Sequence, residues 1–316
     1  MKERRLNDTL YTALKNGELT PLLEIAKADD TLDFELRGDS VNIYYRGGSL
    51  FKIFYSKENI VIYFNEKYCV GQKRQLTSPI TAEEAVDNIP LYKYAMDLWL
   101  KKHPKLEREF QQIIVRENNN IGKISRSTDY YIIDIEYANK LDVDDEIEKE
   151  YIIVNQQSED RKANNARFDI VALKWLSDGA SRKKSNKLSL ALIEVKYGDG
   201  ALKNNAGVDK HLEDFKKFLS NKENFKNFCE DMTEVFKQKC ELGLIDGIQP
   251  HQLKNFEITV NNPEVIFIFA NHDPDSQVLN TIIQDSKNQE YPFPIMIANS
   301  SNMGYCLYSD RMDKIN

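Results

Sequence analysis

The sequence predicts a mixed α/β (α+β) protein, because short apolar runs and longer amphipathic stretches alternate along its 316 residues. Short runs rich in Val, Ile and Leu and bounded by polar turns are typical of strands, whereas apolar residues spaced three and four apart are typical of helices. Two strand-like runs, 167–173 and 188–197, carry charged residues within otherwise apolar sequence. Charges inside apolar strands need a reason, so these two runs are where we look for chemistry.

The composition is that of an ordinary globular protein, with 41% hydrophobic residues and a net charge of −7. An acidic average argues against non-specific coating of nucleic acid, but it leaves room for a local basic strip beside an acidic metal site. No apolar run reaches the roughly 20 residues of a membrane helix, and the first residues lack the apolar core of a signal peptide. Four scattered cysteines predict free thiols rather than disulfides or a zinc site. We therefore expect a cytoplasmic protein with no membrane partner.

Residues 1–80 predict a separate small α+β module. Gly38-Asp39 and Gly47-Gly48 supply tight turns between alternating apolar runs, which is typical of an antiparallel meander. Pro21 suits the first turn of a helix. The elements expected are helices at 6–15 and 21–27, followed by strands at 32–36, 41–45, 50–55 and 60–64.

Residues 81–104 predict a helical connector. Thr81 is placed to cap a helix whose first turn is acidic, and Pro90 is expected to interrupt that helix. A second helix is expected at 91–102, and Pro104 then introduces a third at 106–118. The apolar stripe of this third helix consists of Leu106, Phe110, Ile113 and Ile114.

Three strands are expected next, at 130–137, 167–173 and 188–197. In the first of them Asp134 and Glu136 share one face, which we expect to be exposed to solvent, with a role in lining the site as the alternative. Alternation along the third places Glu194 and Lys196 on one face. If the second and third strands form a hairpin, Asp169 can reach Glu194. The alternative is that Glu194 and Lys196 form a salt-bridged pair on an exposed strand.

Two carboxylates suit a hard cation such as Mg²⁺. A lysine beside the metal can orient a water molecule or neutralise charge that builds up on a phosphate.

Beyond Lys196, a glycine-punctuated loop leads to a helix at 208–219, with His211 at the border of its apolar stripe. A further amphipathic helix is expected at 221–242 and a buried strand at 263–270. The segment 271–274, which contains His272, predicts a turn. Final strands are expected at 293–298 and 304–308.

Asp169 followed by Glu194-Val195-Lys196 resembles the motif of the PD-(D/E)XK nuclease superfamily, with Phe168 in place of the family's proline. The resemblance covers roughly residues 105–270, and the expected element order is similar to the restriction-endonuclease-like core αβββαβ, a mixed sheet flanked by helices. It implies a nuclease-like domain at 105–316, whereas the N-terminal module at 1–80 and the connector at 81–104 lie outside the resemblance.

The resemblance implies a metal-dependent phosphodiesterase that hydrolyses DNA or RNA, with DNA favoured. Asp169 and Glu194, helped by the carbonyl of Val195, would bind Mg²⁺ or Mn²⁺, and Lys196 would orient the attacking water. Family members often place a helix glutamate beside the metal. Among Glu107, Glu109 and Glu117 we favour Glu107. His211 matches the place of a polar side chain that the family directs toward the metal or phosphate.

Other functions stay open, because fold alone does not decide them. The rival interpretation is a non-catalytic nucleic-acid- or protein-binding regulatory protein on a nuclease-like fold. A third is a host-defence or toxin nuclease whose N-terminal module senses a protein partner. Many members of the superfamily act as dimers, so a homodimer is a further expectation.

Overall fold

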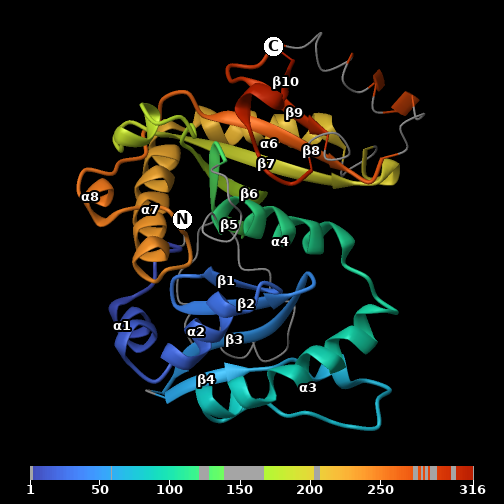
Figure 1. The fold of residues 1–316 in the computed structure, drawn as a ribbon. Helices are drawn as coiled ribbons and strands as arrows, with labels where there is room; N and C mark the ends of the chain where they lie inside the picture. Colours follow the sequence, from blue (N-terminus) through green and yellow to red (C-terminus); the bar gives the residue numbers. More distant parts are fainter. Residues whose placement is uncertain are drawn as a thin grey trace, which may run out of the picture.

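The computed structural model describes residues 3–57, 59–120, 128–138, 167–202, 207–272, 277–278, 280–281, 284, 290–299 and 304–315. These residues form two β-sheets with helices around them, which confirms the mixed α+β class (Figure 1). No helix in the described ranges is long and apolar enough to cross a membrane. Cys69, Cys229, Cys240 and Cys306 form no disulfide with one another.

The first sheet is built by the N-terminal residues, much as the sequence predicts. Its four antiparallel strands follow one another in the order β1-β2-β3-β4. Asn7 caps the first helix, because its Oδ1 accepts a hydrogen bond from the Leu10 main chain at 2.9 Å. The elements are α1 (Asp8–Asn16), α2 (Thr20–Ala28), β1 (Leu32–Leu36), β2 (Ser40–Tyr45), β3 (Gly48–Ser56), β4 (Asn59–Tyr63) and the 3₁₀ turn η1 (Glu66–Cys69).

The predicted break at Pro90 is wrong, since a single helix, α3 (Ala82–Leu100), contains this proline. Its start is as predicted: the Thr81 hydroxyl accepts a hydrogen bond from the Glu84 main chain at 3.2 Å. A proline removes one main-chain hydrogen bond and strains the preceding turn. The buried face continues on both sides of the proline, so tertiary packing holds the helix together; this face includes Ala85, Ile89, Tyr92 and Met96.

The second sheet has six strands in the order β10-β9-β8-β7-β6-β5. Strands β5, β6 and β7 pair antiparallel, whereas β7–β8 and β8–β9 pair parallel, so the sheet is mixed as expected. The elements are α4 (Leu106–Asn119), β5 (Tyr130–Ala138), β6 (Arg167–Lys174), η2 (Ser181–Lys183), β7 (Ser189–Tyr197), η3 (Asp199–Leu202), α6 (Val208–Ser220), α7 (Lys222–Glu241), α8 (Pro250–Leu253), β8 (Glu264–Ala270), β9 (Ile295–Asn299), η5 (Ser309–Arg311) and β10 (Asp313–Lys314).

The strand predicted at 304–308 is wrong, because this segment pairs with a side chain rather than with the sheet. Asn118, near the end of α4, donates from Nδ2 to the Tyr305 carbonyl at 2.9 Å and accepts from the Leu307 main chain at 2.9 Å. The last strand of the sheet is β10, which pairs antiparallel with β9.

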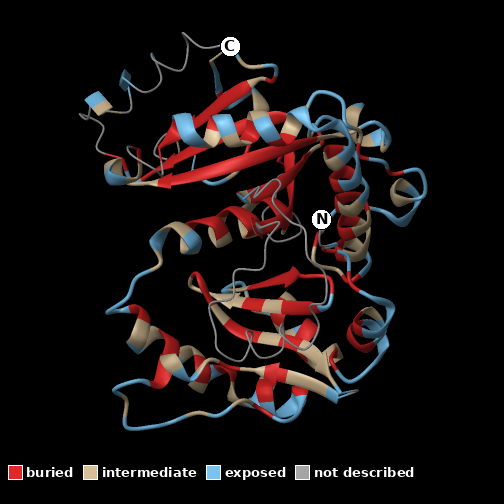
Figure 2. Ribbon diagram, turned by 180° about the vertical axis from the view of Figure 1, so that it is seen from behind, coloured by how far each residue is buried: buried red, intermediate tan, exposed pale blue. Residues whose placement is uncertain are grey.

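Helices cover both faces of the larger sheet (Figures 1 and 2), and β8 is buried throughout its length. Helix α4 lies on the side that faces the smaller sheet, and its apolar residues pack with those of β5, β6 and β7. Helices α6 and α7 contribute to a second hydrophobic cluster. That cluster continues into the N-terminal elements, so the two sheets share packed apolar side chains.

Candidate functional site

The candidate site lies where β6 and β7 separate. Their antiparallel pairing runs from Lys174–Ser189 to Ile170–Ile193, which confirms the predicted hairpin. Beyond that point the Asp169 carboxylate accepts a hydrogen bond from the Val195 main chain at 2.8 Å. A residue's N–H and C=O lie on the same edge of a strand, so the Val195 carbonyl also faces the space beside Asp169.

Glu194 and Lys196 form a buried ion pair in β7, with only 4% and 3% of their surfaces exposed. Lys196 Nζ lies 2.6 Å from Glu194 Oε1, which confirms that the two side chains share a face. The alternative of an exposed surface pair is wrong. Burial raises the pKa of Glu194 to about 7 although Lys196 lowers it, and the nearby carboxylates of Glu107 and Glu136 raise it further.

His211 joins this pair from the first turn of α6. Its Nε2 lies 3.1 Å from Glu194 Oε1 and 3.1 Å from Lys196 Nζ. Burial and the positive charge of Lys196 lower the pKa of His211 to about 4, so the ring is neutral at pH 7. A neutral ring either accepts a hydrogen bond from the Lys196 ammonium at Nε2 or donates its Nε2–H to Glu194. His211 therefore supports the pair without adding charge.

Of the three candidate glutamates of α4, the structure places Glu107 beside the site. Its carboxylate is hydrogen-bonded by the Tyr197 main chain, and burial raises its pKa although Lys196 lowers it. Glu109 instead pairs with Arg46, Oε1 to Nε, at 3.0 Å. Glu117 pairs with Arg116 at 3.3 Å.

The expectation that Asp134 and Glu136 face solvent is wrong for Asp134, whereas Glu136 keeps 26% of its side chain exposed and lies beside the site, as the alternative has it. Asp134 is 1% exposed and pairs with Arg37 of the N-terminal region. Glu136 pairs with Arg108 of α4 at 2.9 Å. A register shift between Ile132 and Asp134 changes where the following side chains of β5 point, and Glu136 itself has a φ of 50°. No glycine marks this bulge, so sequence reasoning had no signal for it.

The register of β5 brings Glu136 level with Asp169, because the pairs Ile135–Ile170 and Tyr137–Phe168 flank them. Burial raises the pKa of Asp169 well above its usual value, and the charges of Glu194, Glu107 and Glu136 raise it further. Among the described residues, these four carboxylates face the two cations Lys196 and Arg108. The site therefore holds more carboxyl groups than cationic side chains, and the raised pKa values reflect the cost of ionising all four carboxyl groups together.

A divalent cation would offset this excess, and the donor atoms suit one. Within the described ranges, no three His, Cys, Asp or Glu side chains converge as a ready-made metal-binding group. Mg²⁺, however, keeps several water ligands and is commonly bound through one or two carboxylates. Asp169, Glu194 and the Val195 carbonyl supply oxygen atoms only, which is the donor type that Mg²⁺ and Mn²⁺ prefer.

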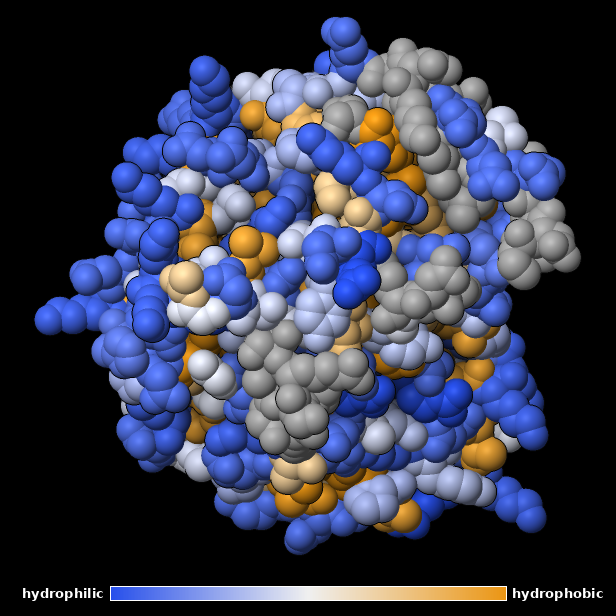
Figure 3. Space-filling model, turned by 45° about the horizontal axis from the view of Figure 1, so that its top comes forward, coloured by the Kyte–Doolittle hydropathy of each residue, from blue (hydrophilic) through white to orange (hydrophobic). Residues whose placement is uncertain are grey.

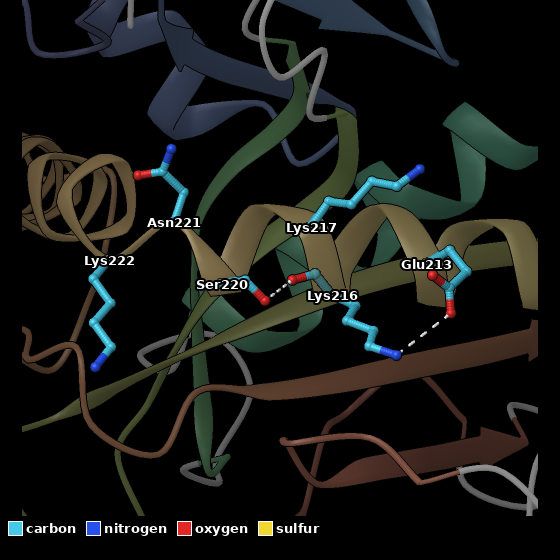
Figure 4. Close-up of a pocket in the computed structure, with 6 residues that line it drawn as sticks. All are labelled: Glu213, Lys216, Lys217, Ser220, Asn221 and Lys222. Atoms are coloured by element: carbon cyan, nitrogen blue, oxygen red, sulfur yellow. Dashed lines mark hydrogen bonds and ion pairs between the residues drawn. The ribbon is translucent and has the colours of Figure 1, made fainter.

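A shallow surface pocket lies elsewhere, at the end of α6 and the start of α7 (Figure 4). Lys216 pairs there with Glu213 at 3.9 Å, and the Ser220 hydroxyl donates to the Lys216 carbonyl at 2.6 Å. The pocket contains none of the candidate site residues. The face of the molecule in Figure 3 is largely hydrophilic, with apolar side chains exposed in separate small areas.

The structure thus brings together the residues singled out in the sequence: Glu107, Asp169, Glu194, Val195, Lys196 and His211. It adds Arg108, which the sequence did not indicate, and Glu136, for which the sequence left a site-lining role open. Comparison of the chain with protein-family models, with curated proteins and with solved structures gave no match.

Proposed function

We propose that the protein is a metal-dependent phosphodiesterase that hydrolyses DNA or RNA. The observation that carries the proposal is the buried excess of carboxylates around Lys196, at the point where the Val195 main chain and Asp169 face the same space. The order α4-β5-β6-β7-α6-β8 supports a restriction-endonuclease-like core of the PD-(D/E)XK type. Asp169, Glu194 and the Val195 carbonyl would hold Mg²⁺ or Mn²⁺.

The protein's own groups have distinct roles in this proposal. Lys196 is oriented by Glu194 and His211, so its ammonium can orient a water molecule and stabilise negative charge that develops on a phosphate. Glu107 adds a carboxylate from the α4 side. A bound divalent cation would lower the pKa of a ligated water and polarise the phosphate.

The first test is cleavage of plasmid DNA, single-stranded DNA and RNA with Mg²⁺ or Mn²⁺. Lys196→Ala should reduce the cleavage rate by about 10²–10³-fold or more, because it removes the positioned cation. The exposed Lys217 provides the matched control variant Lys217→Ala. Circular dichroism and thermal unfolding check that each variant is folded. A Lys196→Ala protein that cleaves at the wild-type rate would contradict this mechanism.

The second test measures metal binding directly, by titration calorimetry with Mg²⁺ and Mn²⁺. Wild type should bind and Asp169→Asn should not, whereas Glu213→Gln, at an exposed carboxylate of α6, should bind like wild type. If wild type binds no metal even with nucleic acid present, the catalytic proposal fails. The non-catalytic binding protein on the same fold is then the better interpretation.

A further inference from the structure

His272 contacts the strand that carries Lys196, although 76 positions separate the two residues. It lies two residues beyond the end of β8, and its side chain is 3% exposed. Its Nδ1 lies 2.7 Å from Asp199 Oδ1, and its Nε2 lies 3.2 Å from the Lys196 carbonyl oxygen. Each ring nitrogen therefore faces an oxygen atom.

These two contacts determine how many protons the ring carries. A carbonyl oxygen is only an acceptor, and an ionised carboxylate is as well. A neutral imidazole has a single N–H and could satisfy only one of the two partners. Both contacts are hydrogen bonds at once when His272 is an imidazolium with Asp199 as its counter-ion.

The contact between His272 and the Lys196 carbonyl lies on the edge of β7 opposite the candidate metal ligands Asp169 and Val195. Val195 is bound by Asp169 on the edge of β7 that faces β6. The Lys196 carbonyl lies on the opposite edge, toward β8, where the Gly198 main chain donates to the Ala270 carbonyl at 2.8 Å. His272 thus adds a hydrogen bond to the main chain of the lysine itself, just before the chain turns into η3.

We propose that His272 is a positioning residue for Lys196: an imidazolium that connects the Lys196 carbonyl to Asp199 and so fixes the direction of the lysine side chain. The proposal rests on the proposed function in one respect, the catalytic use of Lys196. The placement of Lys196 by His272 is a separate property of the fold and is measured without substrate.

The structural test is ¹⁵N NMR of the full-length protein labelled at histidine and lysine. At pH 7 both ring nitrogens of His272 should show the shifts of protonated nitrogen. Asp199→Asn should convert the ring to a neutral form with one protonated nitrogen. A neutral His272 in wild type overturns the proposal, whether or not the protein cleaves nucleic acid.

Three substitutions of His272 distinguish its hydrogen bond to the Lys196 carbonyl from the packing of its ring. His272→Gln keeps a donor at the place of Nε2, His272→Asn keeps one at the place of Nδ1, and His272→Phe keeps only the ring. The Lys196 amide and side-chain ammonium signals should stay near their wild-type positions in His272→Gln and move in the other two variants. Equal signals in all three variants would contradict the proposal.

The kinetic test uses the same variants on whichever nucleic acid the wild type cleaves. His272→Phe and His272→Asn should lower kcat by about 10- to 100-fold with little change in KM, because misplacement of a catalytic group affects the chemical step. His272→Gln should recover most of the activity, and the exposed His251 provides the control His251→Phe. An unchanged kcat in His272→Phe overturns the proposal. If no substrate is cleaved, the proposed function fails and the NMR comparison alone decides the role of His272.

Discussion

The molecule contains two buried groups of charged side chains, and they differ in charge balance. The first lies between the two sheets, where Lys239 Nζ binds Glu35 Oε1 at 2.7 Å and Arg37 binds Asp134. We call it the inter-sheet cluster. In it Arg4, Arg37 and Lys239 form ion pairs with Glu35 and Asp134, and the charges of Lys239 and Arg37 also act on Asp33. The second is the candidate site, where carboxylates outnumber cations.

Two aspartates of neighbouring strands show what the difference means. Burial alone would raise the pKa of Asp134, but Arg37 and Arg4 hold it below its usual value. Burial raises the pKa of Asp169 well above its usual value, and Glu194 raises it further. A buried carboxylate that is paired with arginine is kept ionised by that partner, whereas one raised by burial and like charges is a candidate for binding a cation. The inter-sheet cluster contains its own counter-ions, and the excess of carboxylates at the candidate site is what the proposed metal site requires.

The largest expected effect is a difference between Asp134→Asn and Asp169→Asn in the free energy of unfolding without metal. Asp134→Asn should cost about 3–5 kcal/mol, because it leaves buried arginine charge without its partner. Asp169→Asn should gain on the order of 1 kcal/mol, because it removes a like charge while the amide oxygen still accepts the Val195 N–H. Urea unfolding measures both.

Addition of Mg²⁺ sharpens the same comparison. Wild type and Asp134→Asn should each gain about 2.7 kcal/mol at a metal concentration 100-fold above Kd, and Asp169→Asn should gain nothing. If Asp169→Asn destabilises the metal-free protein as strongly as Asp134→Asn does, the contrast between a binding and a structural cluster is wrong.

The sequence predicts contacts between residues that are close along the chain, and it does not predict contacts between residues that are far apart. Asp169, Glu194 and Lys196 were found because local alternation and a single hairpin bring them together. The same local patterns gave the element types of the strands and helices that carry the site. They failed at Pro90 and at 304–308, where packing or a side chain elsewhere in the chain decides the structure.

The inter-sheet cluster and the contact of His272 with Asp199 could not be predicted from the sequence for a different reason. Arg37 and Asp134 are 97 positions apart, and His272 and Asp199 are 73 apart. No periodicity links such pairs, and each residue alone is most often exposed. Only the packing of the two sheets, and of β8 beside β7, shows which charges meet.

The next effect concerns the pH dependence of stability, to which Asp33 of the inter-sheet cluster should contribute. Burial raises the pKa of Asp33 to about 6, although Lys239 and Arg37 lower it. In the unfolded chain this carboxyl has a pKa of about 4, so between pH 4 and 6 the folded protein retains a proton that the unfolded chain has lost. Stability therefore falls as pH rises through this window.

Asp33→Asn should remove the part of the fall in stability between about pH 4 and 6 that Asp33 causes. Relative to the variant, wild type should become less stable by up to about 3 kcal/mol from pH 4 to pH 7. Urea midpoints at each pH measure the difference, with Asp87→Asn at an exposed carboxylate as the control. A constant difference between wild type and Asp33→Asn across this range contradicts the assignment.

The last prediction concerns the contact between the N-terminal sheet and α4, the helix that carries Glu107. Two glycines in the left-handed region allow the effect of this contact to be measured separately. Gly47 has a φ of 74°, and an added Cβ would lie 2.8 Å from the Lys105 carbonyl oxygen and 2.9 Å from the Glu109 nitrogen at the start of α4. Gly71 has a φ of 76° with nothing within 4 Å of an added Cβ. Alanine is strained equally at both positions, but only at Gly47 does it press on the helix that carries Glu107.

Gly71→Ala should therefore cost about 1–2 kcal/mol of stability and leave cleavage unchanged. Gly47→Ala should cost about 1–3 kcal/mol more, because the turn between β2 and β3 must move away from α4. The Gly47 main chain also donates to Gln112 at 2.7 Å, so this movement should displace the first turn of α4 and lower the cleavage rate. Equal activity in the two variants would show that the site does not depend on the N-terminal sheet, and that the two clusters serve the protein independently.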